Sequence, residues 1–243
     1  LSASLLVGCS SGTASSVPVS ASSAAESTVS SVEETASSAV DENEAAAAQL
    51  LNDLTGSYQE LWPVILADEY KQTWLDDCTA LVGEDNAEAA FEKLSSMVTG
   101  DVYGEDAVKA YANGGGAYFC GFTNSLAILT FDGETSTISG TDKDGNVLFS
   151  HTYHYIGMEP VRGLYEFQSD DADSGEFTYF FLAPDTSAET YHIEFRYGSD
   201  AEALSQYDTG EYAYWLASGI STDCDQTMID NCIELFCTEN LAG

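Results

Sequence analysis

The segment ETYHIEFRY (residues 189–197) alternates polar and apolar side chains, as a β-strand with one buried face does. It is the last of seven short stretches with a period of two that follow one another from Ala117 onward. The predicted strands are 117–123, 126–131, 135–140, 147–155, 163–168, 176–182 and 189–197. Turn signals such as Asp144-Gly145 separate them. Seven short strands at this spacing predict an antiparallel barrel or sandwich.

Helical periodicity precedes and follows these strands. Apolar residues recur at spacings of three and four in both regions. The predicted helices are 45–54, 59–74, 86–97, a short one around Val108, and 224–237. The sequence therefore predicts N-terminal helices, a seven-stranded β-structure and one C-terminal helix that packs an apolar stripe.

The charge excludes several functions. Among 243 residues, 41 are acidic and six are basic, for a net charge of −35. Six basic residues cannot line a groove for nucleic acid, which needs lysine and arginine to replace phosphate counterions. No apolar run approaches the ~18 residues of a transmembrane helix. Two interpretations stay open: the charge keeps the surface soluble, or its field concentrates metal cations.

The N-terminal 44 residues predict a lipid anchor and a tether. Residues 1–9 end in Leu6-Val7-Gly8-Cys9, which resembles a bacterial lipobox at the end of a truncated signal peptide. Resemblance to lipoproteins implies a lipidated Cys9 and anchoring to the outer face of the cell membrane. Residues 10–44 contain neither aromatic nor basic residues, which predicts a disordered tether. The remaining domain, 45–243, keeps 35 acidic against six basic residues, a charge of −29.

Catalytic motifs are missing from the sequence. There is no nucleophile elbow, P-loop, HExxH or dinucleotide fingerprint, so no reaction is predicted. Asp142 to Gly145 faintly resembles a calcium loop, but Gly140 and His151 fall where carboxylates are needed, so a hairpin turn is favoured. The cysteines Cys78, Cys120, Cys224, Cys232 and Cys237 form no CxxC motif, and their odd number leaves at least one thiol unpaired.

A candidate metal site lies on the last predicted strand. Alternation places His192, Glu194 and Arg196 on one face. Imidazole and carboxylate both ligate zinc, so His192 and Glu194 can share an ion. The alternative is a polar sheet face with a Glu194–Arg196 pair. His151 and His154, three residues apart on a strand, are expected on opposite faces and should not chelate together.

Five segments, in the same order along the chain, resemble the ZinT (YodA) family. They are LNDLTGSYQELWP (51–63), GLYEF (163–167), FFLAP (180–184), HIEFRYGSD (192–200) and residues 212–220. Asp53, Gly56, Gln59 and Pro63 fall on the family's opening signature. The resemblance implies a lipocalin-like (calycin) antiparallel barrel with flanking helices. It also implies an extracytoplasmic protein that recruits divalent zinc and delivers it to a zinc-uptake transporter.

The family's three zinc-binding histidines are only partly retained. In register, His192 matches the first histidine of the family's pair, Glu194 replaces the second, and Phe180 replaces the strand histidine. Another register places His192 on the second and Thr190 on the first. Zinc affinity is therefore low unless a third ligand comes from elsewhere, such as His154 or an acid. The alternative is a barrel with a decayed metal site, whose aromatic-lined mouth, including Phe180, binds a small apolar ligand or a protein partner.

Overall fold

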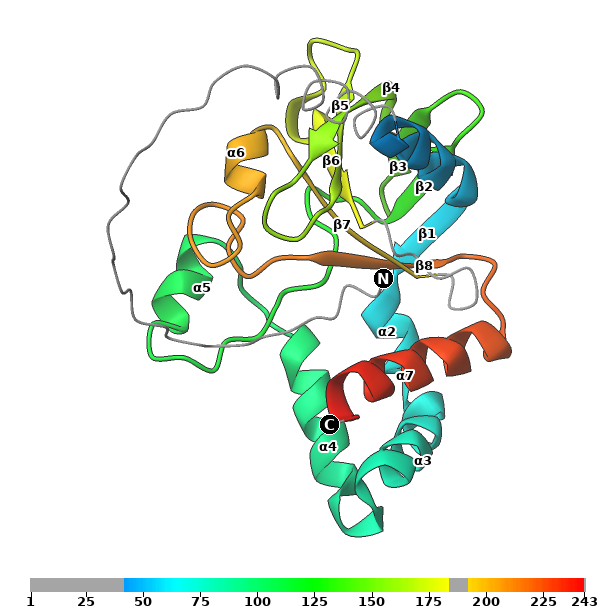
Figure 1. Cartoon of the computed structure of the whole chain (residues 1–243), viewed down its shortest axis with the longest axis vertical. Helices are drawn as coiled ribbons and strands as arrows, with labels where there is room; N and C mark the ends of the chain where they lie inside the picture. The colour runs from blue at the N-terminus through cyan, green and yellow to red at the C-terminus, as the bar shows by residue number, and fades with distance from the viewer. Residues whose placement is uncertain (1–41, 184–191, 243) are drawn as a thin grey trace, which may run out of the picture.

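Eight antiparallel strands close into a barrel in chain order, each bonded to its sequence neighbour and β8 to β1 (Figure 1). This computed structural model describes residues 42–183 and 192–242. The strands are β1 (Gly56–Glu60), β2 (Ile128–Asp132), β3 (Thr137–Thr141), β4 (Val147–Met158), β5 (Tyr165–Ser169), β6 (Tyr179–Leu182), β7 (His192–Gly198) and β8 (Ala217–Ser221). This meander is the up-and-down topology of lipocalins, so the predicted barrel is confirmed and the sandwich alternative is wrong.

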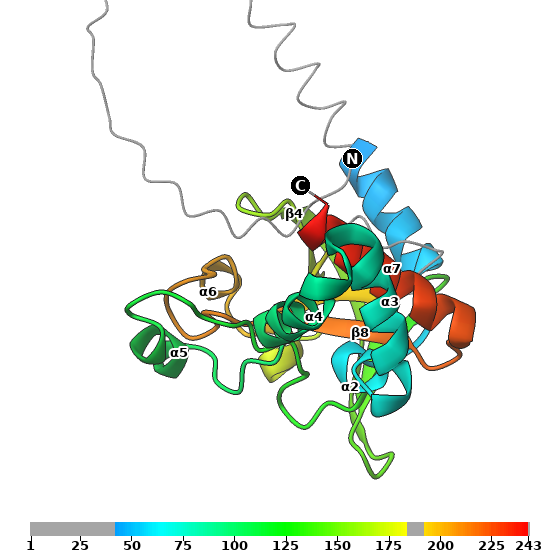
Figure 2. The same cartoon turned by 90° about the horizontal axis from the view of Figure 1, so that it is seen from below.

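Helices cover one side and one end of the barrel. A helix over residues 42–53 begins the described chain. It is followed by α2 (Leu61–Ile65), η1 (Asp68–Tyr70), α3 (Lys71–Val82), α4 (Glu84–Val98), α5 (Glu105–Ala110), η2 (Gly175–Phe177), α6 (Ala201–Leu204) and α7 (Gln226–Leu241). Helices α3, α4 and α7 lie together beside β8 (Figure 2). Their apolar faces and Ile220 of β8 form one buried cluster that includes Trp74, Leu94 and Ile233. We call these three helices the helical layer.

The barrel interior is filled by aromatic rings. Phe180 of β6 lies 5.8 Å from Phe149 and 5.4 Å from Tyr153, measured between ring centroids. Both partners belong to β4, which is not a neighbour of β6 in the sheet, so the rings meet inside the closed barrel. Phe195 and Tyr197 of β7 also stack on Phe180. All these rings are buried, so this part of the barrel is a packed core and not a ligand cavity.

The predicted strands from 126 to 197 correspond to β2 through β7, with ends shifted by a few residues where the structure describes them. Residues 189–191 of the last predicted strand lie outside the described residues. The predicted strand 117–123 is wrong: within the described residues it makes only isolated bridges, in which Phe119 pairs with Thr99 and Trp215. The predicted helix 59–74 is also wrong at its start, because Gln59 belongs to β1. The rest is divided among α2, η1 and α3. The Trp74 indole, which donates to the Ile65 carbonyl at 2.7 Å, fixes α3 against the end of α2.

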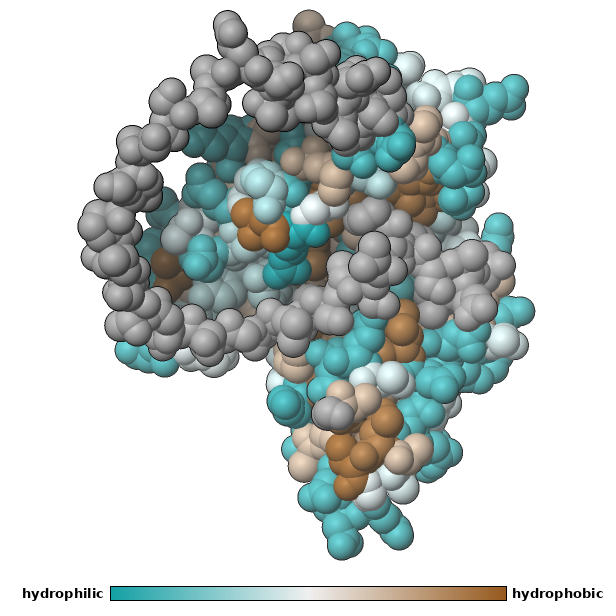
Figure 3. Space-filling model, viewed as in Figure 1, coloured by the Kyte–Doolittle hydropathy of each residue, from teal (hydrophilic) through white to brown (hydrophobic). Residues whose placement is uncertain are grey.

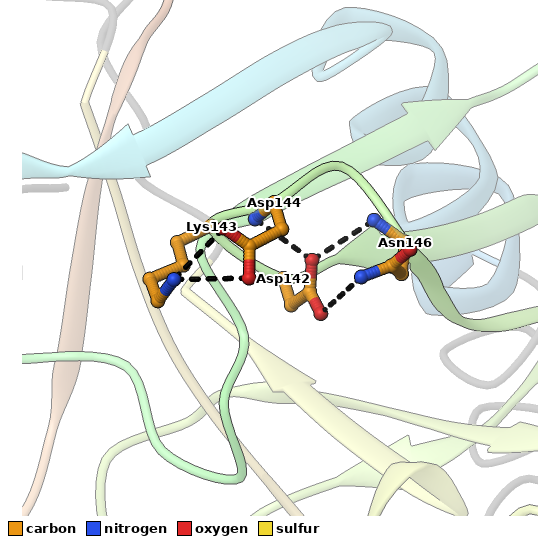
Figure 4. Close-up of polar contacts among 4 residues, drawn as sticks. All are labelled: Asp142, Lys143, Asp144 and Asn146. Atoms are coloured by element: carbon orange, nitrogen blue, oxygen red, sulfur yellow. Dashed lines mark hydrogen bonds and ion pairs between the residues drawn. The ribbon is translucent and has the colours of Figure 1, made fainter.

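The hairpin between β3 and β4 confirms the turn predicted at Asp144-Gly145. Gly145 has φ of 81°, as a tight turn requires. The Asp142 carboxylate accepts hydrogen bonds from the backbone of Asp144 and from the backbone and side chain of Asn146, each at 2.9 Å (Figure 4). These bonds hold the pKa of Asp142 below its usual value, and the bonds from Asn146 have the largest effect. Both oxygens already accept N–H donors, which agrees with a turn instead of a calcium loop.

The predicted lipobox Cys9 lies outside the described residues, as does nearly all of the predicted tether. The first described helix begins at residue 42, slightly before the predicted domain boundary at 45. No helix within the described ranges is long and apolar enough to cross a bilayer. The face of the molecule shown in Figure 3 is mainly hydrophilic, with small separate apolar groups.

Candidate metal centre

Strand β7 places His192 and Glu194 on the outer face of the barrel. Ile193, Phe195 and Tyr197 belong to the barrel core, so the residues between them point outward. Cross-strand pairing agrees: His192 is opposite Ile220 of β8, whose side chain packs with the helical layer. The two predicted ligands therefore share one face, as alternation predicted, and both are half-buried.

A cysteine that the ligand prediction did not include lies near Glu194. Glu194 is opposite Ser218 of β8, and the Ser218 amide donates to the Cys120 carbonyl at 3.0 Å. Burial and then the negative charge of Glu194 raise the pKa of the Cys120 thiol to about 12. Imidazole, carboxylate and thiol donors are thus present in one region of the outer face. All three are groups that bind zinc.

Phe180, at the position of the family's strand histidine, lies on the other side of the sheet. It is opposite Tyr197 on β7, and its ring is fully buried in the barrel core. His192 and Glu194 face outward, so these three positions do not converge. The prediction that Phe180 lines an aromatic mouth is wrong, because its ring packs against Phe149, Tyr153 and Phe195 in the interior.

His151 and His154 lie on opposite faces of β4, as predicted. His151 lies between Phe149 and Tyr153 on the inner side, with its Nδ1 2.6 Å from an Asp171 oxygen. His154 is exposed, with its Nδ1 2.6 Å from an Asp170 oxygen. Neither aspartate was among the predicted site residues. Their signal is the antiparallel register, which brings the residues after β5 back beside β4.

His154 is too far from His192 to complete its site. The row of paired residues that contains His154 runs through Gln168 and Tyr179 to Gly198, at the far end of β7. Gly198 is six positions from His192, a distance of roughly 20 Å along a strand. The suggestion that His154 supplies the third ligand is therefore wrong.

Arg196, the third outward residue of β7, has a structural role. Its guanidinium donates to the backbone carbonyls of Leu204, Gln206 and Tyr212, and it lies 4.4 Å from the Tyr207 ring centroid. The side chain is completely buried, and burial lowers its pKa. Arg196 thus holds the segment around α6 against the barrel.

The described residues do not contain a complete metal site. Across 42–183 and 192–242, no three or more His, Cys, Asp or Glu side chains are arranged to hold a metal ion. His192 and Glu194 share the outer face of β7, and their role as ligands stays a prediction.

A cavity of about 340 Å³ opens beside this region. Its lining includes Glu60, Trp62, Leu66, Phe119 and Cys120. Glu60 already accepts a hydrogen bond from the Phe122 amide at 2.6 Å. The Trp62 indole nitrogen is buried and makes no hydrogen bond. The cavity wall thus mixes apolar side chains with polar groups, which include the Glu60 carboxylate, the Cys120 thiol and the Thr99 hydroxyl.

The protein is a closed antiparallel barrel with a helical layer. The outer face of β7 carries the candidate metal site, with His192 and Glu194 as its two predicted ligands. No protein-family model matches the chain, and no curated protein is detectably similar to it in sequence. Among solved structures, the chain is similar to the Zn(II)-bound ZinT-like domain of Streptococcus pneumoniae AdcA. The identity is 16%, the TM-score is 0.47, and the match covers 76% of this chain and 89% of that domain.

The chain is also similar to Zn(II)-bound AdcA from the same organism. The identity is again 16%, with a TM-score of 0.43, and the match covers 77% of this chain and 35% of AdcA. At this identity the likeness concerns the fold alone.

Proposed function

We propose that this chain is an exported, lipid-anchored protein that binds and recruits a divalent metal, zinc, and that it is not an enzyme. The observation that carries the proposal is the placement of His192 and Glu194 on one outer face of β7, near Cys120. Two zinc-binding side chains on the same face of one strand give a partial site, with two of the ligands that zinc needs. Low affinity is expected, because the third family position is Phe180.

The charge supports the choice of a cation as ligand. The domain has a charge of −29, so its field raises the local concentration of divalent ions. Diffuse acidity does not select zinc over calcium, whereas an imidazole nitrogen does, because calcium prefers oxygen ligands. Zinc specificity in this chain therefore depends on His192.

Anchoring and delivery belong to the same proposal. A lipidated Cys9 and the predicted tether would hold the barrel outside the membrane, within reach of a zinc-uptake transporter. Cys9→Ala should abolish incorporation of labelled fatty acid when the chain is expressed behind a complete signal peptide in a bacterium. Labelling that persists in Cys9→Ala would contradict the anchor.

Calorimetric titration of the purified full chain with Zn²⁺, in excess Ca²⁺, tests the metal proposal. Calcium occupies the diffuse acidic sites, so the remaining heat reports zinc-selective binding. We expect about one selective Zn²⁺ per chain. His192→Ala should weaken zinc binding at least tenfold. Loss of a ligand should lower the affinity at least as much as loss of a residue that only orients a ligand by a hydrogen bond. Glu194→Gln should also weaken it.

His154→Ala is the matched control. It removes an exposed histidine beside Asp170, in a row of paired residues that meets β7 at the end far from His192. Zinc binding should be unchanged in this variant. Equal effects of His154→Ala and His192→Ala, or no effect of His192→Ala, would show that zinc binds elsewhere.

The cavity favours a second candidate function, the binding of a small apolar ligand outside the barrel. Trp62 and Phe119 contribute aromatic walls, and the volume of about 340 Å³ suits a small molecule. A neutral dye, Nile red, should gain fluorescence with the wild-type chain, and Leu66→Trp, which fills the cavity, should remove that gain. Equal fluorescence with both chains would exclude the cavity as the binding site.

A further inference from the structure

Two buried cysteines meet in the helical layer. Cys78 of α3 and Cys237 of α7 have their sulfur atoms 3.9 Å apart, although 159 positions separate them in the sequence. Both side chains are completely buried. They lie beside the aromatic contact between Trp74 and Phe236, one helical turn before Cys78 and one residue before Cys237. In sequence, the two helices that they join lie on either side of strands β2 to β8.

The other described cysteines are less suited to either partner. Cys120 lies at the cavity, and its sulfur is 3.8 Å from the Tyr118 carbonyl oxygen. Cys232 and Cys237 are five residues apart on α7, about 140° around the helix, so they project in different directions. Cys224 precedes α7 and is partly exposed. Position in the fold therefore selects Cys78 and Cys237 as a pair.

We infer that Cys78 and Cys237 are the site of an oxidative modification, a disulfide that joins α3 to α7 when the chain folds in an oxidising environment. Both cysteines are free thiols in this structure, and their sulfur atoms are in van der Waals contact. A movement of roughly 2 Å brings them to bonding distance. The link would close a loop that contains strands β2 to β8.

The reaction is a thiol–disulfide exchange with a disulfide oxidant. The thiolate of one cysteine attacks the oxidant, forms a mixed disulfide and releases one oxidant sulfur as a thiol. The thiolate of the second cysteine then attacks the mixed disulfide and releases the other oxidant sulfur. The chain loses two hydrogens and the oxidant gains them. The bond forms before the helical layer is complete, because the folded layer buries both thiols, and burial raises the pKa of both.

Refolding of the full chain with reduced and oxidised glutathione tests the inference. Remaining thiols are alkylated in denaturant, and the digest is analysed by mass spectrometry without reduction. We expect a major cross-linked peptide pair, lighter by two hydrogens, that contains Cys78 and Cys237. The melting temperature should exceed that of the chain refolded in excess dithiothreitol by roughly 5–15 °C.

Cys120→Ala is the matched control and should keep both the cross-link and the higher melting temperature. Cys237→Ala should lose both. The comparison of wild-type chain refolded with glutathione or dithiothreitol needs no substitution, so it decides the outcome even if a variant fails to fold. Alkylated Cys78 and Cys237 after refolding with glutathione, or a major link from either to another cysteine, would overturn the inference.

Discussion

At the scale of single residues, the direction of a side chain decides what its chemistry can do. Phe180 and His192 lie on neighbouring strands, yet one points into the barrel and the other outward. The aromatic ring at position 180 is therefore part of the core and not a lost ligand that a single substitution could restore. The same principle divides His151 from His154 on β4.

Phe180→His tests this directly. The imidazole would enter the aromatic core without a hydrogen-bond partner, so unfolding by urea should show a loss of about 2–4 kcal/mol. Zinc affinity should not increase, because His192 and Glu194 face away from position 180. Phe180→Leu is the control for ring volume and should cost less than the histidine. A tenfold gain in zinc affinity with Phe180→His would show that the three positions converge.

At the scale of elements, the contact between α3 and α7 carries an electrostatic cost. Asp77 of α3 is half-buried, and its pKa is raised by burial and then by Glu234 and Asp230 of α7. The folded state therefore binds a proton more readily than the unfolded state does. As pH rises, the unfolded state loses this proton near pH 3.8, whereas the folded state loses it only near the raised pKa. Once the folded state has lost the proton, the carboxylates of Asp77, Glu234 and Asp230 repel one another. The cost is complete once pH exceeds the raised pKa.

Asp77→Asn should therefore stabilise the chain at pH 7, by about 0.5 kcal/mol. The gain should shrink as pH falls and disappear below the unfolded pKa of 3.8, where the wild-type carboxyl is also neutral. Urea unfolding at several pH values measures it. Glu92→Gln, on the exposed side of α4, should change stability less. Destabilisation by Asp77→Asn at pH 7 would contradict the assignment.

The elements also show what could be predicted from the sequence. Strands β2 to β7 were recognised because most of them have one face toward the core and one toward solvent, which leaves a period of two. Strand β8 lies between the barrel core and the helical layer, so four of its five residues are buried and the period is lost. A Cβ at Gly219 would lie 3.1 Å from Ile193, so close packing explains a small residue there.

The same limit applies to the site. Alternation was sufficient to place His192 and Glu194 on one face. It could not show whether that face is inside or outside, because this depends on how the sheet closes. Cys120 was missed because no local motif connects it with Glu194. It reaches that region by pairing with Ser218, the residue opposite Glu194, which lies 98 positions later in the sequence.

At the scale of the whole molecule, the dominant property is a net charge of −35. Like charges repel one another across the surface and destabilise the compact state. Sodium chloride screens this repulsion, because the Debye length falls to about 10 Å at 0.1 M. The melting temperature at pH 7 should therefore rise with sodium chloride concentration.

The same titration near the sequence pI of about 4.1 is the control, since little net charge is left to screen there. The rise should be much smaller. A melting temperature that falls with salt at pH 7 would mean that attractive ion pairs outweigh the repulsion. That result would be unexpected for a chain with six basic residues.

The closure of the barrel between β1 and β8 has a kinetic consequence. Tyr58 pairs with Ser221 and Glu60 with Gly219, so the first strand of the barrel finds its second partner only when the last strand, β8, exists. Contacts between such distant positions give a high contact order, and folds of this kind form slowly. Until β8 is present, one edge of β1 stays open to other strands. The barrel therefore closes only after β8 has been made and not progressively from β1.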